Sequence, residues 1–139
     1  MKRFIVLLLA ILSIGFLFSG CSSGTEDVVF SCDDFNKQQN LDANVTVDSG
    51  ETVTVKLCSN ASTGFSWDEN AKIADTGILK QTGQQVISPE KDMPGAAGQQ
   101  EWTFTALKSG TTTAYLEYGR PWEGGEKGVW TFTLTVTVK

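Results

Sequence analysis

The chain has 139 residues, no histidine and a formal net charge of −5. Without histidine it cannot carry a Ser-His-Asp or Cys-His nucleophilic apparatus or a histidine-ligated metal, so we expect no such hydrolase and no metal or other cofactor. An acidic chain without a run of Lys and Arg is a poor ligand for phosphate backbones, which argues against a nucleic-acid partner.

Residues 1–20 have the pattern of a targeting segment. The basic pair Lys2-Arg3 precedes an apolar run from Phe4 to Phe18, and small residues follow, as in a signal peptide. The alternative is an uncleaved transmembrane anchor. A run of about 15 residues is short for that, because a bilayer core needs roughly 20 residues of helix.

The end of this segment, Phe18-Ser19-Gly20-Cys21, resembles the lipobox of bacterial lipoproteins, although Phe18 stands where the lipobox more often has Leu. The resemblance implies cleavage before Cys21 and acylation, for example with palmitate, of the mature N-terminal cysteine. Several acyl chains give a stable anchor where one chain gives only a marginal one. We therefore expect an exported protein, lipid-anchored to a bacterial cell membrane or outer membrane on its periplasmic or extracellular face.

Residues 21–39 are rich in Ser, Asp, Asn and Gln and show no sustained period. This composition predicts a flexible N-terminal tether. Cys32 in this segment and Cys58 beyond it belong to a compartment in which disulfides persist, so we predict that they pair; two unpaired buried thiols are the alternative. A bridge that closes a loop of about 25 residues contributes roughly 3 kcal/mol in the chain-entropy model.

Residues 40–139 alternate apolar and polar side chains with period two, and turn residues interrupt the pattern at short intervals. We place Trp67, Trp102 and Trp130 at inward positions of the strands, in the core. About seven short strands of this kind predict an all-β fold, an antiparallel immunoglobulin-like β-sandwich, with a closed barrel as the alternative. The expected strands lie around 45–47, 53–57, 65–67, 85–88 (a weak candidate), 102–106, 111–118 and 130–138.

Three connections between these strands have an unusual composition. In a Greek-key sandwich such connections emerge at one end of the domain, where loops carry binding function. Taken singly, the first could be a turn and the second a flexible linker, whereas an exposed Trp in the third is seldom left without a partner. The segments are Asn60-Ala61-Ser62-Thr63-Gly64-Phe65, then Gly95-Ala96-Ala97-Gly98 after Met93-Pro94, and Arg120-Pro121-Trp122.

Together, the three segments resemble the motifs of the chagasin family of cysteine protease inhibitors, which are Asn-Pro-Thr-Thr-Gly-Tyr/Phe, Gly-x-Gly-Gly and Arg-Pro-Trp. The resemblance spans residues 41–139. It implies a reversible inhibitor that occludes the active-site cleft of papain-like cysteine proteases with three loops, Thr63 and Gly64 lying beside the enzyme's catalytic cysteine and histidine. It also implies protease contacts for the following residues: Asn60, Ser62, Thr63, Gly64, Phe65, Gly95, Ala96, Ala97, Gly98, Arg120, Pro121 and Trp122.

Two departures from these motifs bear on affinity. Ala61 stands where the family has Pro, which loosens the first loop, and Ala97 stands where the family has Gly. If position 97 required a positive φ, an Ala there would cost on the order of 1 kcal/mol.

Two other functions compete with inhibition. The carboxylate pairs Asp33-Asp34 and Glu123 with Glu126 could serve acid–base chemistry on a glycoside, but they fall in predicted tether or loop, so we expect no enzyme. A lipid-anchored immunoglobulin-like adhesion module that binds a carbohydrate or protein is the main alternative, because the fold alone does not decide function. We expect a monomer whose partners are the protease and, through Cys21, the membrane.

Overall fold

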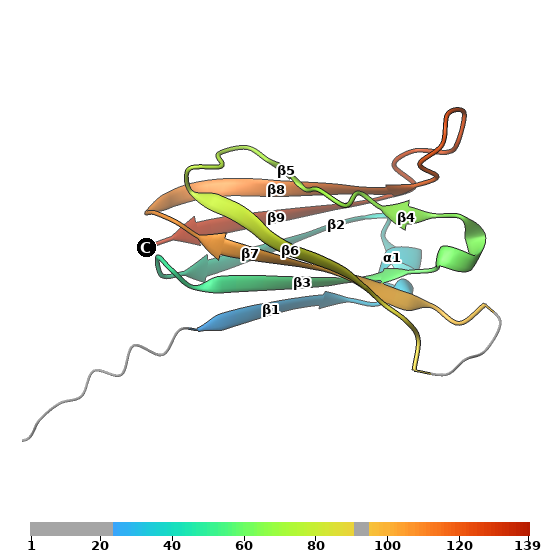
Figure 1. Cartoon of the computed structure of the whole chain (residues 1–139), viewed down its shortest axis with the longest axis horizontal. Coiled ribbons are helices and arrows are strands. Elements are labelled where there is room, and N and C mark those ends of the chain that lie inside the picture. The colour runs from blue at the N-terminus through green and yellow to red at the C-terminus, as the bar shows by residue number, and fades with distance from the viewer. Residues whose placement is uncertain (1–23, 91–94) are drawn as a thin grey trace, which may run out of the picture.

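The computed structural model describes residues 24–90 and 95–139. The predicted signal peptide, Cys21 and the Met93-Pro94 step lie outside the described residues. Within those residues the chain forms two sheets that face each other as two layers (Figure 1), with strand orders β1-β3-β7-β6 and β2-β9-β8-β4, and β5 pairs with β8 beside the second. The predicted all-β sandwich is confirmed.

The described elements, in chain order, are β1 (Thr25–Phe30), α1 (Cys32–Lys37), β2 (Asn40–Val47), β3 (Thr52–Ser59), the 3-10 turn η1 (Ala61–Thr63), β4 (Ser66–Trp67), β5 (Lys72–Ile73), β6 (Leu79–Ile87), β7 (Gly98–Ala106), β8 (Gly110–Gly119) and β9 (Trp130–Val138). None of the helices in this part of the chain has the length and apolar character needed to cross a membrane.

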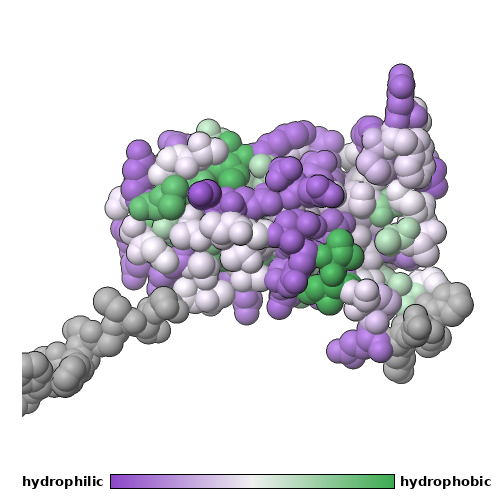
Figure 2. Space-filling view, in the orientation of Figure 1, coloured by the Kyte–Doolittle hydropathy of each residue, from purple (hydrophilic) through white to green (hydrophobic). Residues whose placement is uncertain are grey.

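The alternation of side chains decides which face of each strand is buried. In β9, Phe132, Leu134 and Val136 are buried between the sheets, while the intervening threonines are half-buried on the outer face. Figure 2 shows the result on one face of the molecule, which is mostly hydrophilic and carries only small separate apolar patches. Trp67 and Trp102 lie in the core as predicted, whereas Trp130 is only half-buried.

The strand directions differ from the expected antiparallel arrangement at two edges. β1 runs parallel to β3 and β2 runs parallel to β9, while the other strand pairs in the described residues are antiparallel. The period-two pattern is the same in both directions, because side chains alternate across a strand whichever way its neighbour runs. The alternation of side chains therefore could not predict whether neighbouring strands run parallel or antiparallel.

The weak strand expected at 85–88 is the end of β6, a strand of nine residues. The register between β6 and β7 shifts between Gln81 and Gly83. Such a bulge moves the side chains that follow to new positions, so the alternation is interrupted in the sequence although the strand continues.

The prediction of a flexible tether is wrong for the described residues 24–39. β1 pairs with β3 along its whole length, from Thr25 opposite Thr52 to Phe30 opposite Leu57. Phe35 of α1 is fully buried in the core. The apolar residues of this segment are too few to give a period. Phe35 is nevertheless in the core and Val28 and Phe30 pack against it, while Val29 is exposed, so the folded domain includes this segment.

The polar residues of the same segment have a structural use at the start of α1. The Ser31 side chain accepts the Asp34 N–H, and the Asp34 carboxylate accepts the Ser31 N–H at 2.8 Å, which forms a capping box. The Ser31 hydroxyl also donates to the Asp34 carboxylate at 2.7 Å, and this bond, together with the one from the Ser31 N–H, lowers the pKa of Asp34 below its ordinary value of 3.8. A cap of this kind stabilises a helix that is too short to form by itself.

The predicted disulfide is confirmed: Cys32, the first residue of α1, is joined to Cys58 near the end of β3, with a Cα–Cα distance of 5.1 Å. The bridge attaches the N-terminal segment to the strand that leads into the first predicted loop.

Candidate functional site

The three predicted loops meet at one end of the sandwich (Figure 1). Loop 1 (residues 60–65) joins β3 to β4, loop 2 (95–98) leads into β7, and loop 3 (120–122) begins the β8–β9 connection. We call the three loops together the rim. The chain end Lys139 and the turns before β3 and β8 lie at the opposite end of the molecule.

Loop 1 is closed by its own hydrogen bonds. The Ser62 hydroxyl donates to Asn60 Oδ1 at 2.6 Å and the Thr63 hydroxyl donates to the Asn60 carbonyl at 2.7 Å. Gly64 then takes a left-handed conformation with φ 78°, which favours glycine because it has no Cβ. The loop is therefore rigid without the proline that Ala61 replaces, and the Thr63 oxygen keeps lone pairs with which it can accept a hydrogen bond.

Loop 3 packs directly on loop 1. The Arg120 guanidinium lies over the Phe65 ring at 4.5 Å and 5.8 Å from the Trp122 ring. A Cβ at Gly64 would stand only 2.7 Å from Cη2 of Trp122, so the indole lies against the glycine backbone. The two loops form one surface, from which the Trp122 side chain is 52% exposed.

Loop 2 contacts loop 1 through a single described side-chain hydrogen bond, from Asn60 Nδ2 to the Gly95 carbonyl at 3.4 Å. Gly95 is left-handed, and no non-glycine residue in the described ranges has a positive φ, so Ala97 carries no left-handed strain. At Gly98, a Cβ would collide with the Ile87 carbonyl oxygen. The glycine there allows β6 and β7 to come together at the base of loop 2.

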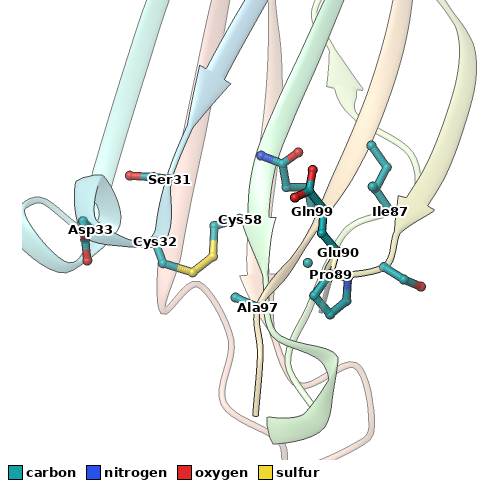
Figure 3. Close-up of a pocket in the computed structure, with 11 residues that line it drawn as sticks. Ser31, Cys32, Asp33, Cys58, Ile87, Pro89, Glu90, Ala97 and Gln99 are labelled. Atoms are coloured by element: carbon teal, nitrogen blue, oxygen red, sulfur yellow. A yellow bond between two sulfur atoms is a disulfide. The ribbon is translucent and has the colours of Figure 1, made fainter. Parts of the chain in front are cut away.

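The disulfide supports the bases of loops 1 and 2. Figure 3 shows Cys32 and Cys58 beside Ala97, in a surface hollow that Pro89 and Gln99 also line. Because Cys58 lies two residues before Asn60, the bridge holds α1 against the strand end from which loop 1 departs. The N-terminal segment is thus part of the foundation of the rim.

A row of stacked aromatic rings connects the rim to α1. Phe65 stacks on Tyr118 with ring centroids 5.6 Å apart, Tyr118 on Trp130 at 4.7 Å, and Trp130 on Phe35 at 5.0 Å. Arg120 covers the rim end of this row. The Tyr118 hydroxyl also accepts the Asn60 N–H at 3.0 Å, so the row positions loop 1 from below.

Sequence reasoning missed Phe35, Tyr118 and Trp130 as supports of the site. Phe35 falls in a segment without period, and the other two look like ordinary core residues of strands. Only the position of Tyr118, two residues before Arg120, could have indicated a link to loop 3.

The rim is suited to binding by its shape, and its side chains do not form a catalytic arrangement. Thr63 and Trp122 are exposed on it, with small or backbone-dominated residues around them. Of the carboxylate pairs considered above, Asp34 is engaged in the cap of α1, and Glu123 and Glu126 are exposed in the connection after loop 3. A rigid edge of this kind can fill a cleft on another protein.

Comparison with known proteins identifies the same region. The model of the Chagasin family peptidase inhibitor I42 matches residues 46–136. Chagasin of Trypanosoma cruzi is 31% identical over 94 residues, which cover 66% of this chain and 86% of that protein. Amoebiasin-2 of Entamoeba histolytica is 30% identical over 97 residues, covering 70% of this chain and 78% of that protein.

Solved structures have the same fold. The cysteine protease inhibitor EhICP2 from Entamoeba histolytica has a TM-score of 0.60 at 22% identity, covering 83% of this chain and 97% of that one. PbICP-C, solved in complex with falcipain-2, has a TM-score of 0.54 at 14% identity, covering 82% and 99%. All three loops lie inside the family match, whereas β1 and α1 precede it.

Proposed function

This chain belongs to the chagasin family of peptidase inhibitors, and we propose that its rim enters the active-site cleft of a papain-like cysteine protease. The protein is an inhibitor of cysteine proteases and not an enzyme. The observation that carries the proposal for the rim is the contact of Trp122 with Gly64, which makes one continuous edge from loops that lie far apart in the sequence.

We assign the centre of this edge, Thr63 and Gly64, to the catalytic cysteine and histidine of the protease. Gly64 has no side chain to hold the backbone away, and the Thr63 oxygen can accept a hydrogen bond from the protonated histidine. No peptide carbonyl has to be presented to the thiolate in this arrangement. The inhibitor therefore blocks the cleft without being cleaved.

Loops 2 and 3 then contact the two walls of the cleft. Loop 2 offers mainly backbone, as expected of a segment that lies flat against a wall. Loop 3 offers Trp122, a residue type common at interface hot spots. Arg120 also stacks on Phe65, and this contact braces loop 3 against loop 1. A braced rim loses less conformational entropy on binding, which favours affinity.

The test is a titration of the purified protein against papain and a cathepsin L-like enzyme, followed by hydrolysis of a peptide substrate. Trp122→Ala and Gly64→Arg should each raise the inhibition constant at least tenfold, about 1.4 kcal/mol. Leu107→Ala is the matched control, since Leu107 is an exposed apolar residue outside the rim, just after β7. Equal inhibition by all variants would refute the rim as the protease-binding edge.

We also propose that the protein is a lipoprotein anchored through Cys21. Two observations support this: the resemblance of residues 18–21 to a lipobox, and the start of β1 at the end of the molecule opposite the rim (Figure 1). An anchor on that side leaves the rim directed away from the membrane. Cys21→Ser should move the protein from the membrane fraction to the soluble fraction and abolish palmitate labelling. Continued labelling of that variant would refute acylation at Cys21.

A further inference from the structure

An apolar groove lies next to the rim, on the side of the aromatic row. It has a volume of about 380 Å³, and its lining includes Asn36 of α1, Thr63 and Phe65 of loop 1, and Tyr118, Val129 and Trp130 of β8, β9 and their connection. Every described side chain that lines it is uncharged. The groove therefore suits an apolar, neutral group.

We propose that this groove is a second contact site for the same protease, occupied by an apolar side chain from the surface beside the catalytic cleft. The inference rests on the proposed function and extends it to α1 and to Tyr118 and Trp130 of the aromatic row, which lie outside the three loop motifs.

Continuity with the rim is the first reason to assign the groove to the protease. Asn60 and Thr63 belong to loop 1 and also line the groove. A protease that seats its catalytic residues on Thr63 must therefore extend over the mouth of the groove, because the two surfaces share that residue.

The contact area that inhibition requires is the second reason. Protease–inhibitor complexes bury on the order of 800 Å² on each partner. The rim consists largely of small residues, and among the described residues Trp122 is its one exposed large apolar side chain. The half-buried ring of Phe65, at the end of loop 1, and that of Trp130 beyond the loops continue the apolar surface into the groove, and their burial adds to the contact area of the rim.

Rigidity of the groove is the third reason. Its floor is the aromatic row, with Tyr118 and Trp130 stacked at an interplanar angle of 11°, and its α1 side is held by the disulfide at Cys32. A preformed apolar hollow binds a side chain without first ordering its own walls. The groove is therefore preorganised in the free inhibitor.

Variants of Asn36 test the groove directly. Asn36 is exposed and lines one wall, so a larger side chain there fills the hollow without entering the core. Asn36→Arg and the neutral Asn36→Trp should each raise the inhibition constant for papain or for a cathepsin L-like enzyme about tenfold, with an unchanged melting temperature. Gln39→Arg, an exposed residue of the same segment outside the groove, is the matched control for added charge and should inhibit like wild type.

Hydrogen exchange gives an independent readout. Amides of α1, residues 32–37, should exchange more slowly in the protease complex than in the free inhibitor. Unchanged inhibition constants for both Asn36 variants, an equal loss for Gln39→Arg, or unchanged exchange of α1 would each overturn the proposal. A wild-type protein that self-associates through the groove, detected as an Asn36-dependent change of mass in light scattering, would also overturn it. A wild-type protein that inhibits neither enzyme would instead remove the proposed function itself.

Discussion

The close approach of Trp122 to Gly64 leads to a sharp prediction about Gly64→Ala. The added Cβ would stand 2.7 Å from Cη2 and 3.3 Å from Cζ3 of the indole, whereas carbon atoms prefer separations of about 3.5–4.0 Å. The ring must move outward by roughly 1 Å. Because the Trp122 side chain is 52% exposed, it can do so without disturbing the core, and the exposed edge of the rim changes shape.

The effects of Gly64→Ala on thermal stability and on protease inhibition should therefore be distinguishable. Alanine with φ 78° costs about 1–2 kcal/mol in folding, a loss of roughly 4 °C in melting temperature per kcal/mol for a domain of this size. Gly50→Ala is the matched control, because Gly50 has φ 91° with nothing within 4 Å of its Cβ position. It should show a similar thermal loss with unchanged inhibition, whereas Gly64→Ala should raise the inhibition constant for papain at least tenfold.

A double variant isolates the cause. If the effect of Gly64→Ala passes through the indole, it should nearly vanish in a Trp122→Ala background, since contacting residues are not additive. Full additivity of the two changes, or equal inhibition by Gly64→Ala and Gly50→Ala, would refute the reasoning.

Three further predictions follow from the supports of the rim. Replacing Cys32 and Cys58 together by Ser should lower the free energy of unfolding in urea by about 3 kcal/mol, and wild type measured in reductant should match that variant; no difference from oxidised wild type would contradict the role of the bridge. Because its pKa is lowered, Asp34 should stabilise the fold fully above about pH 4 and lose that effect as pH falls through the lowered pKa. The melting temperature of wild type should thus exceed that of Asp34→Asn near neutral pH and converge with it in acid, and a gap that persists in acid would speak against the cap. Arg120→Lys should weaken inhibition of papain about fivefold, since an ammonium cannot stack on Phe65 as a planar guanidinium does, and an unchanged inhibition constant would rule out the brace.

Local chemistry explains why the sandwich and the three loops could be predicted from the sequence. The threonine and aliphatic alternation of β9 is a property of consecutive residues, and so is the left-handed turn at Gly64. The family motifs likewise consist of neighbouring residues. The pairing of Cys32 with Cys58 was also predicted from the sequence, and the structure contains that bridge.

Other features arise only when distant segments meet. Residues 24–39 carry too few apolar side chains to form a pattern, and the burial of Phe35 depends on a sandwich built from the rest of the chain. The parallel pairing of β1 with β3 and of β2 with β9 leaves no trace in a period-two pattern, since the period is the same in both directions.

The sequence by itself determined the sandwich fold, the position of strands such as β9, where the three loops fall and which family they resemble, because these depend on neighbours along the chain. Only the tertiary structure decided that Arg120 stacks on Phe65, that Trp122 covers Gly64, and that the aromatic row joins the rim to α1. Such contacts join residues far apart in the chain, and their geometry is set by how the two sheets pack, which no local pattern encodes.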